Sequence, residues 1–73
     1  MTRFEIIIGY LLSEIVDYLD ELYFASKKDL KRYHQLIDNV IACINRDLED
    51  ESLEPLSSDE IKNVILEIKY ILS

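Results

Sequence analysis

The chain has 73 residues, of which 49% are apolar and 32% are charged, and its net charge is −7. This length limits it to one domain, residues 1–73, and the apolar content excludes a disordered chain. The acidic balance argues against direct binding of nucleic acid or of an anionic membrane, because both need clustered Lys and Arg.

The apolar segment near the start, residues 4–12, contains Glu5 and is followed by further acids. It therefore fits neither a signal peptide nor a membrane span. Cys43 is the only cysteine, so no internal disulfide forms. Together these features predict a cytoplasmic protein.

The first predicted helix covers residues 3–25 and begins at a capping box, Thr2 to Glu5. Its apolar residues recur every three or four positions, which is the period of one helix face. A strand at residues 3–12 is the alternative, because Ile and Tyr favour strands, but no second strand candidate could pair with it. The expected core residues of this helix are Phe4, Ile8, Leu11, Ile15, Leu19 and Leu22, flanked by Ile7, Leu12 and Tyr18.

Two further helices are predicted at residues 27–49 and 58–72, after capping boxes that begin at Ser26 and Ser57. An acidic linker with Pro55, residues 49–57, separates them. The prediction is an all-α three-helix bundle, in which dimerisation is one way to complete a small core. The expected core residues are Leu30, Tyr33, Ile37, Val40, Ile41, Ile44 and Leu48 in the second helix and Ile61, Val64, Ile65, Ile68, Ile71 and Leu72 in the third.

Charge is divided by segment, with −4 in residues 1–25, +3 in residues 26–46 and −6 in residues 47–73. The bases gather at the start of the middle helix, at Lys27, Lys28, Lys31 and Arg32. The simplest interpretation is that this helix complements two acidic neighbours. A corner that recognises an anion is the alternative.

No catalytic motif is present. His34 and Asp38 lie one helical turn apart, but no activated nucleophile accompanies them. Cys43 lies in mid-helix, where a thiol is not activated. The sequence predicts a protein that is not an enzyme and that has no cofactor and no metal site.

Apolar residues on helix faces that should be exposed to solvent, together with clustered acidic residues, point instead to a partner. The apolar ones fall opposite the predicted core stripes, and the acidic ones gather on the first helix and the linker. The predicted partner-binding residues are Ile6, Tyr10, Asp17, Asp20, Glu21, Phe24, Glu49, Asp50, Glu51, Leu66 and Tyr70.

These features predict a non-catalytic binding module that occupies a basic surface of a larger protein, as inhibitor, antitoxin and immunity proteins do. A homodimer built through the leftover apolar residues is the alternative. A mimic of nucleic-acid phosphate is a third hypothesis.

Overall fold

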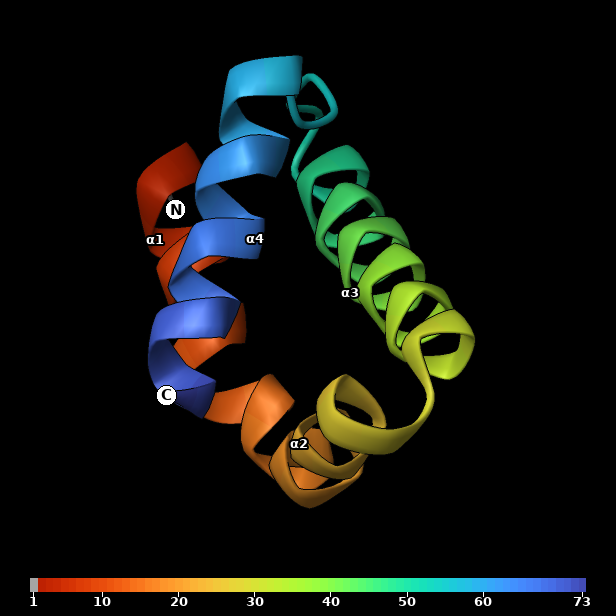
Figure 1. Ribbon diagram of the computed structural model, residues 1–73. Coiled ribbons are helices and arrows are strands. Elements are labelled where there is room, and N and C mark those ends of the chain that lie inside the picture. The colour runs from red at the N-terminus through yellow and green to blue at the C-terminus, as the bar shows by residue number, and fades with distance from the viewer. Residues whose placement is uncertain (1) are drawn as a thin grey trace.

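A computed structural model describes residues 2–73. The chain forms three helical segments (Figure 1). The first segment, called here the first arm, is bent and comprises four consecutive pieces. The other two are straight helices, so the predicted all-α three-helix bundle is confirmed. The elements are α1 Arg3–Gly9, the π-helical η1 Tyr10–Glu14, the 3₁₀-helical η2 Ile15–Tyr18, α2 Leu19–Lys28, α3 Leu30–Asp50 and α4 Ser58–Leu72.

Two of the three predicted capping boxes are confirmed. Thr2 accepts a hydrogen bond from the N–H of Glu5, and Ser57 accepts one from the N–H of Glu60. The third prediction is wrong, because α2 continues to Lys28 and the Ser26 hydroxyl donates to the carbonyl of Tyr23 inside that helix. Asp29 caps α3 instead, since its carboxylate accepts from the N–H of Arg32.

The bend of the first arm has a local cause. The Ser13 hydroxyl donates to the Gly9 carbonyl at 2.6 Å, a bond that competes with the regular backbone ladder and bends helices. The chain widens there into η1, where the N–H of Ile15 bonds to the carbonyl of Tyr10, five residues earlier. It then tightens into η2, and Tyr18, with φ −119° and ψ 13°, turns the chain into α2.

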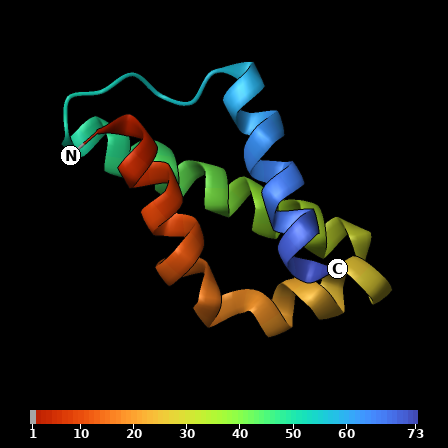
Figure 2. The same ribbon diagram turned by 90° about the vertical axis from the view of Figure 1, so that its left-hand side faces the viewer.

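The helices share one apolar core. Its fully buried side chains come from all three segments, and α2 packs against both α3 and α4. In Figure 2, α1 and α4 run next to each other in front of α3, which runs in the opposite sense. The largest fully buried side chains are Ile15, Leu22, Ile44, Leu48 and Ile68.

Three predicted core residues are exposed instead. Phe4 is 70% exposed, Leu30 is 64% exposed and Ile71 is 38% exposed. Leu30 is the first residue of α3, directly after its cap, where the chain changes direction at the end of the molecule. Phe4 is turned outward because Ile6 and Tyr10 take the inward side of α1 and η1.

Arg3 joins three parts of the chain. Its Nε and Nη2 donate to the two carboxylate oxygens of Glu60, each at 2.7 Å. Its Nη1 and Nη2 also donate to the backbone carbonyls of Glu54 and Pro55, at 2.6 and 2.7 Å. This two-pronged contact, which fits the planar guanidinium, ties the start of α1 to the linker and to the start of α4.

The C-terminal end of α3 is closed by a Schellman motif. The N–H of Leu53 bonds to the carbonyl of Leu48, and the N–H of Ser52 bonds to that of Glu49, both at 2.9 Å. Ser52 has φ of +59°, in the left-handed region that favours glycine. The linker is then held by Asn45, whose side-chain oxygen accepts from the N–H of Leu56 at 2.7 Å.

We expect Ser52→Gly to stabilise the protein. The left-handed conformation costs a residue with a Cβ roughly 1–2 kcal/mol, whereas glycine loses roughly 0.5–1 kcal/mol more backbone entropy on folding. The balance is a gain of about 0.5 kcal/mol in the free energy of unfolding, measured by urea denaturation. Ser52→Ala is the matched control, because it keeps the strain, and a gain as large as that of glycine would contradict this explanation.

We expect the Arg3–Glu60 contact to make stability depend on acid pH. The hydrogen bonds from Arg3, reinforced by the N–H of Ser57, lower the pKa of Glu60 from 4.5 to about 2. Because the pKa is lower in the folded state, this stabilisation is fully present above pH 4.5 and is lost as the pH falls toward 2.

Thermal melts between pH 7 and pH 2 test this pH dependence. Glu60→Gln should be less stable than the wild type at pH 7, and the difference should shrink below pH 4.5. Glu67→Gln, on the same helix, serves as the control, since Glu67 makes no ion pair among residues 2–73. A difference between wild type and Glu60→Gln that stays constant with pH would contradict the assignment.

Candidate functional site

Two of the predicted partner-binding residues are buried, so this part of the surface prediction is wrong. Ile6 is 6% exposed and Tyr10 is 5% exposed. The prediction assumed a regular α-helix, but Tyr10 and Ile15 are one π-helical turn apart and therefore face the same side. The widened turn brings Ile6, Tyr10 and Leu11 to the core and leaves Leu12 71% exposed.

The other apolar candidates are exposed. Phe24 lies on α2, and Leu66 and Tyr70 lie one turn apart on α4. Tyr70 is the most exposed of the large apolar side chains, at 79%. That these three residues bind a partner stays a prediction.

The predicted acidic residues fall into two groups. Asp17, Asp20 and Glu21 are exposed on the first arm, where Glu21 accepts a hydrogen bond from Arg32 of α3 and forms an ion pair with it. This contact is of the kind expected if the basic start of α3 complements its acidic neighbours. The second group, Glu49, Asp50 and Glu51, is exposed at the end of α3 and in the turn that follows.

Asp50 and Glu51 form part of an acidic groove between the first arm and the end of α3, with a volume of about 330 Å³. The buried Ile6 and Tyr10 form its floor, and the exposed Gly9 and Ser13 also line it. Among the described residues that line it, none is Lys or Arg. The carboxylates of this acidic groove belong to Glu5, Glu14, Asp47, Asp50 and Glu51.

Sequence reasoning missed three of these five carboxylates. Asp47 lies three and four residues before Asp50 and Glu51, so the helical spacing alone places the three on one side of α3. Glu5 and Glu14 could not be found in this way, because their position opposite Asp47 depends on how α1 and η1 pack against α3. Within the groove, Glu5 also caps α1, and its hydrogen bonds to Thr2 lower its pKa.

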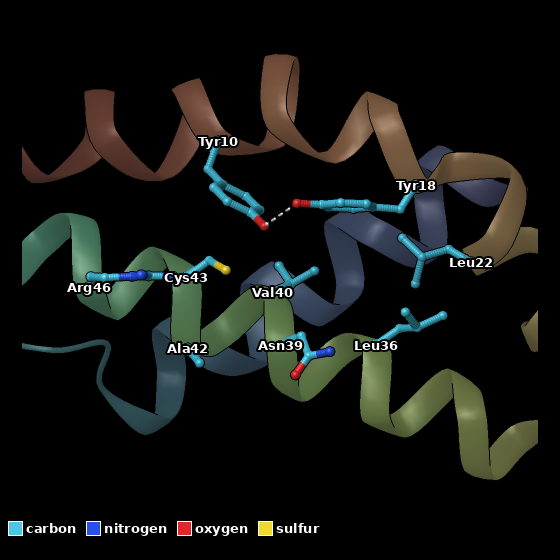
Figure 3. A pocket seen from close by; sticks show the side chains of 9 residues that line it. All are labelled: Tyr10, Tyr18, Leu22, Leu36, Asn39, Val40, Ala42, Cys43 and Arg46. Atoms are coloured by element: carbon cyan, nitrogen blue, oxygen red, sulfur yellow. Dashed lines mark hydrogen bonds between the residues drawn. The ribbon is translucent and has the colours of Figure 1, made fainter.

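A second pocket, of about 360 Å³, lies farther along the seam between the first arm and α3 (Figure 3). The hydroxyls of Tyr10 and Tyr18 point toward one another, 3.4 Å apart, and the Cys43 sulfur lies close to them. Burial is the main cause that raises the pKa of the Tyr10 phenol, followed by its hydrogen bond with Tyr18. The phenol thus stays protonated well beyond the ordinary range of tyrosine. The remaining lining residues are Leu22, Leu36, Asn39, Val40, Ala42 and Arg46.

The residues considered for catalysis are not assembled into a site. His34 and Asp38 are both exposed on α3, and the ring of His34 contacts the edge of Tyr33, with centroids 5.9 Å apart. Within residues 2–73, no hydrogen bond joins His34 to Asp38. In the same range, no three His, Cys, Asp or Glu side chains lie close enough to hold one metal ion.

A third hollow, the α1–α4 groove, is mainly apolar and has a volume of about 500 Å³. Phe4, Ile7, Ile8 and Leu11 line it from the first arm, and Val64 lines it from α4. The polar residues that line it come from α4 and are Glu60, Asn63 and Glu67.

Comparison of the chain with protein-family models, with curated proteins and with solved structures finds no match. Within residues 2–73, no helix combines the length and the apolar character needed to cross a membrane. The grooves themselves therefore carry the functional argument.

The burial of Tyr10 leads to a prediction that separates it from Tyr70. Tyr10→Ala should lower the free energy of unfolding by about 3 kcal/mol, because it leaves a cavity in the core. Tyr70→Ala removes the same side chain from an exposed position and should change the free energy of unfolding by less than about 0.5 kcal/mol. Urea denaturation of both variants measures this, and similar losses in the two would contradict the placement of Tyr10.

Proposed function

We propose that this protein is a non-catalytic binding module that holds a basic segment of a partner protein in the acidic groove. The observation that carries the proposal is the composition of that groove. Five carboxylates from two helices surround an apolar floor, and no base among the described lining residues neutralises them. The potentials of neighbouring carboxylates add, so the groove attracts cationic side chains.

The spread of these carboxylates favours a protein over a metal ion as the ligand. A single cation needs several oxygen atoms that converge on one point, and the described residues contain no such group. A segment with several Lys or Arg residues can instead meet the carboxylates one by one. The stems of these side chains are apolar, so they would also cover Ile6 and Tyr10 on the floor.

The proposed binding surface does not include the acidic residues around Glu21 on the first arm. Glu21 is already paired with Arg32, so its charge is partly compensated within the chain. None of Asp47, Asp50 and Glu51 forms an ion pair within residues 2–73, and all three are exposed. Because they lie at the C-terminal end of α3, where the helix dipole is negative, they add to the field there.

The test measures binding of a short Arg-rich peptide that contains Leu, by fluorescence anisotropy. The groove variant is Asp47→Asn/Asp50→Asn/Glu51→Gln, which should weaken binding about tenfold or more and reduce its salt dependence. These changes should not unfold the protein, because they remove negative charge from the negative end of a helix.

The matched control is Asp17→Asn/Asp20→Asn/Asp38→Asn, which removes the same net charge from exposed positions that do not line the groove. It should weaken binding much less than the groove variant. Equal losses in the two variants would show that only net charge matters. That result, the absence of binding, or binding that is insensitive to salt would each overturn the proposal. Circular dichroism of both variants confirms that they are folded.

A further inference from the structure

The α1–α4 groove is continuous with exposed apolar side chains on both helices. On the first arm, Phe4, Ile8, Leu12 and Val16 follow one another at intervals of four. Four residues are close to one turn both of the α-helix and of the wider π turn, so these side chains form a stripe along one side. Phe4 and Ile8 line the groove, and Leu12 and Val16 are exposed farther along the stripe.

Helix α4 also carries exposed apolar side chains beside the groove. Asn63 lines the groove, and Leu66 and Tyr70 follow it by three and seven residues, so they share its side of the helix. Figure 2 looks onto α1 and α4 from the side where they run next to each other. We call the groove and its two apolar borders the apolar face. It combines a hollow, the groove, with exposed side chains that project beside it.

The area of this face matches what a dimer needs. The accessible surface of the chain is 5213 Å², against about 4,700 Å² expected for a monomeric protein of this mass. The exposed parts of Phe4, Leu12, Val16, Leu66 and Tyr70 amount to roughly 600 Å². A standard interface buries about 600–1,000 Å² on each partner, so these side chains alone reach the lower end of that range.

The low charge of this face allows a second copy to occupy it. Two chains of net charge −7 repel one another, so they can associate only where few charges meet. Of the two carboxylates that line the α1–α4 groove, Glu60 is paired with Arg3. Within residues 2–73, Glu67 is the only carboxylate in that lining that forms no ion pair. The acidic groove, with its five carboxylates, lies elsewhere, between the first arm and α3.

We propose that the apolar face is the interface of a homodimer, in which each copy places side chains of its stripe in the α1–α4 groove of the other. Projections and hollow lie next to each other on one face, which is what a two-fold interface requires. This interface is separate from the acidic groove and does not depend on the function proposed for that groove.

Analytical ultracentrifugation of the full chain tests the dimer. The wild type should have twice the monomer mass of 8.6 kDa at high concentration, and its melting temperature should rise with protein concentration. Phe4→Ser/Leu12→Ser should weaken dimerisation on the order of tenfold or more. Both side chains are exposed in the single chain, so circular dichroism should show that the variant remains folded.

The matched control is Phe24→Ser/Leu30→Ser, which removes the same two residue types at 65% and 64% exposure, away from the apolar face. It should dimerise like the wild type. A wild type that is monomeric at every concentration overturns the proposal, and so does a dimer that survives Phe4→Ser/Leu12→Ser or is lost in the control.

Salt gives an independent readout. Screening weakens the repulsion between two acidic chains, so dimerisation should hold or tighten as NaCl rises, whereas binding of the Arg-rich peptide should weaken. Dimerisation that is lost with rising salt would overturn the apolar interface. Peptide binding by Phe4→Ser/Leu12→Ser, measured in parallel, separates a failure of this proposal from a failure of the acidic groove.

Discussion

The guanidinium of Arg3 holds together the end of the bundle at which α1 and α4 begin. It binds both oxygens of Glu60 and the carbonyls of Glu54 and Pro55, so α1, the linker and α4 meet at one point. At the other end, α4 packs against α2. Both ends of α4 are therefore held, and the α1–α4 groove lies between these two attachments.

The bend in the first arm decides which helices this segment contacts. The bend allows both α1 and α2 to pack against α3 while α2 also contacts α4. The π turn at Tyr10–Glu14, the 3₁₀ turn at Ile15–Tyr18 and the altered backbone of Tyr18 redirect the chain. As a result the first arm borders two different surfaces, the acidic groove on the side of α3 and the α1–α4 groove on the other.

What could be predicted from the sequence is what local interactions decide. The capping boxes at Thr2 and Ser57 and the apolar periods identify the helices, because each signal lies within a few residues. The exchange of Phe4 for Ile6 in the core could not be predicted, since it follows from the widened turn beside Ser13, and a serine inside a helical pattern does not by itself indicate a π turn. The acidic groove is an intermediate case, because Asp47 and Asp50 share a face by spacing, whereas Glu14 joins them only through helix packing.

The division of charge allows both proposed surfaces to operate in one molecule. The five carboxylates of the acidic groove form no ion pair within residues 2–73, and the pairing of Glu60 with Arg3 reduces charge beside the apolar face. A dimer formed through that face would leave both acidic grooves open to solvent. Two grooves held in one assembly raise the effective concentration for a partner with two basic segments. Dimerisation would therefore strengthen capture of such a partner without any new contact, and loss of Phe4 and Leu12 would weaken that capture while leaving the affinity of each groove for a single peptide unchanged.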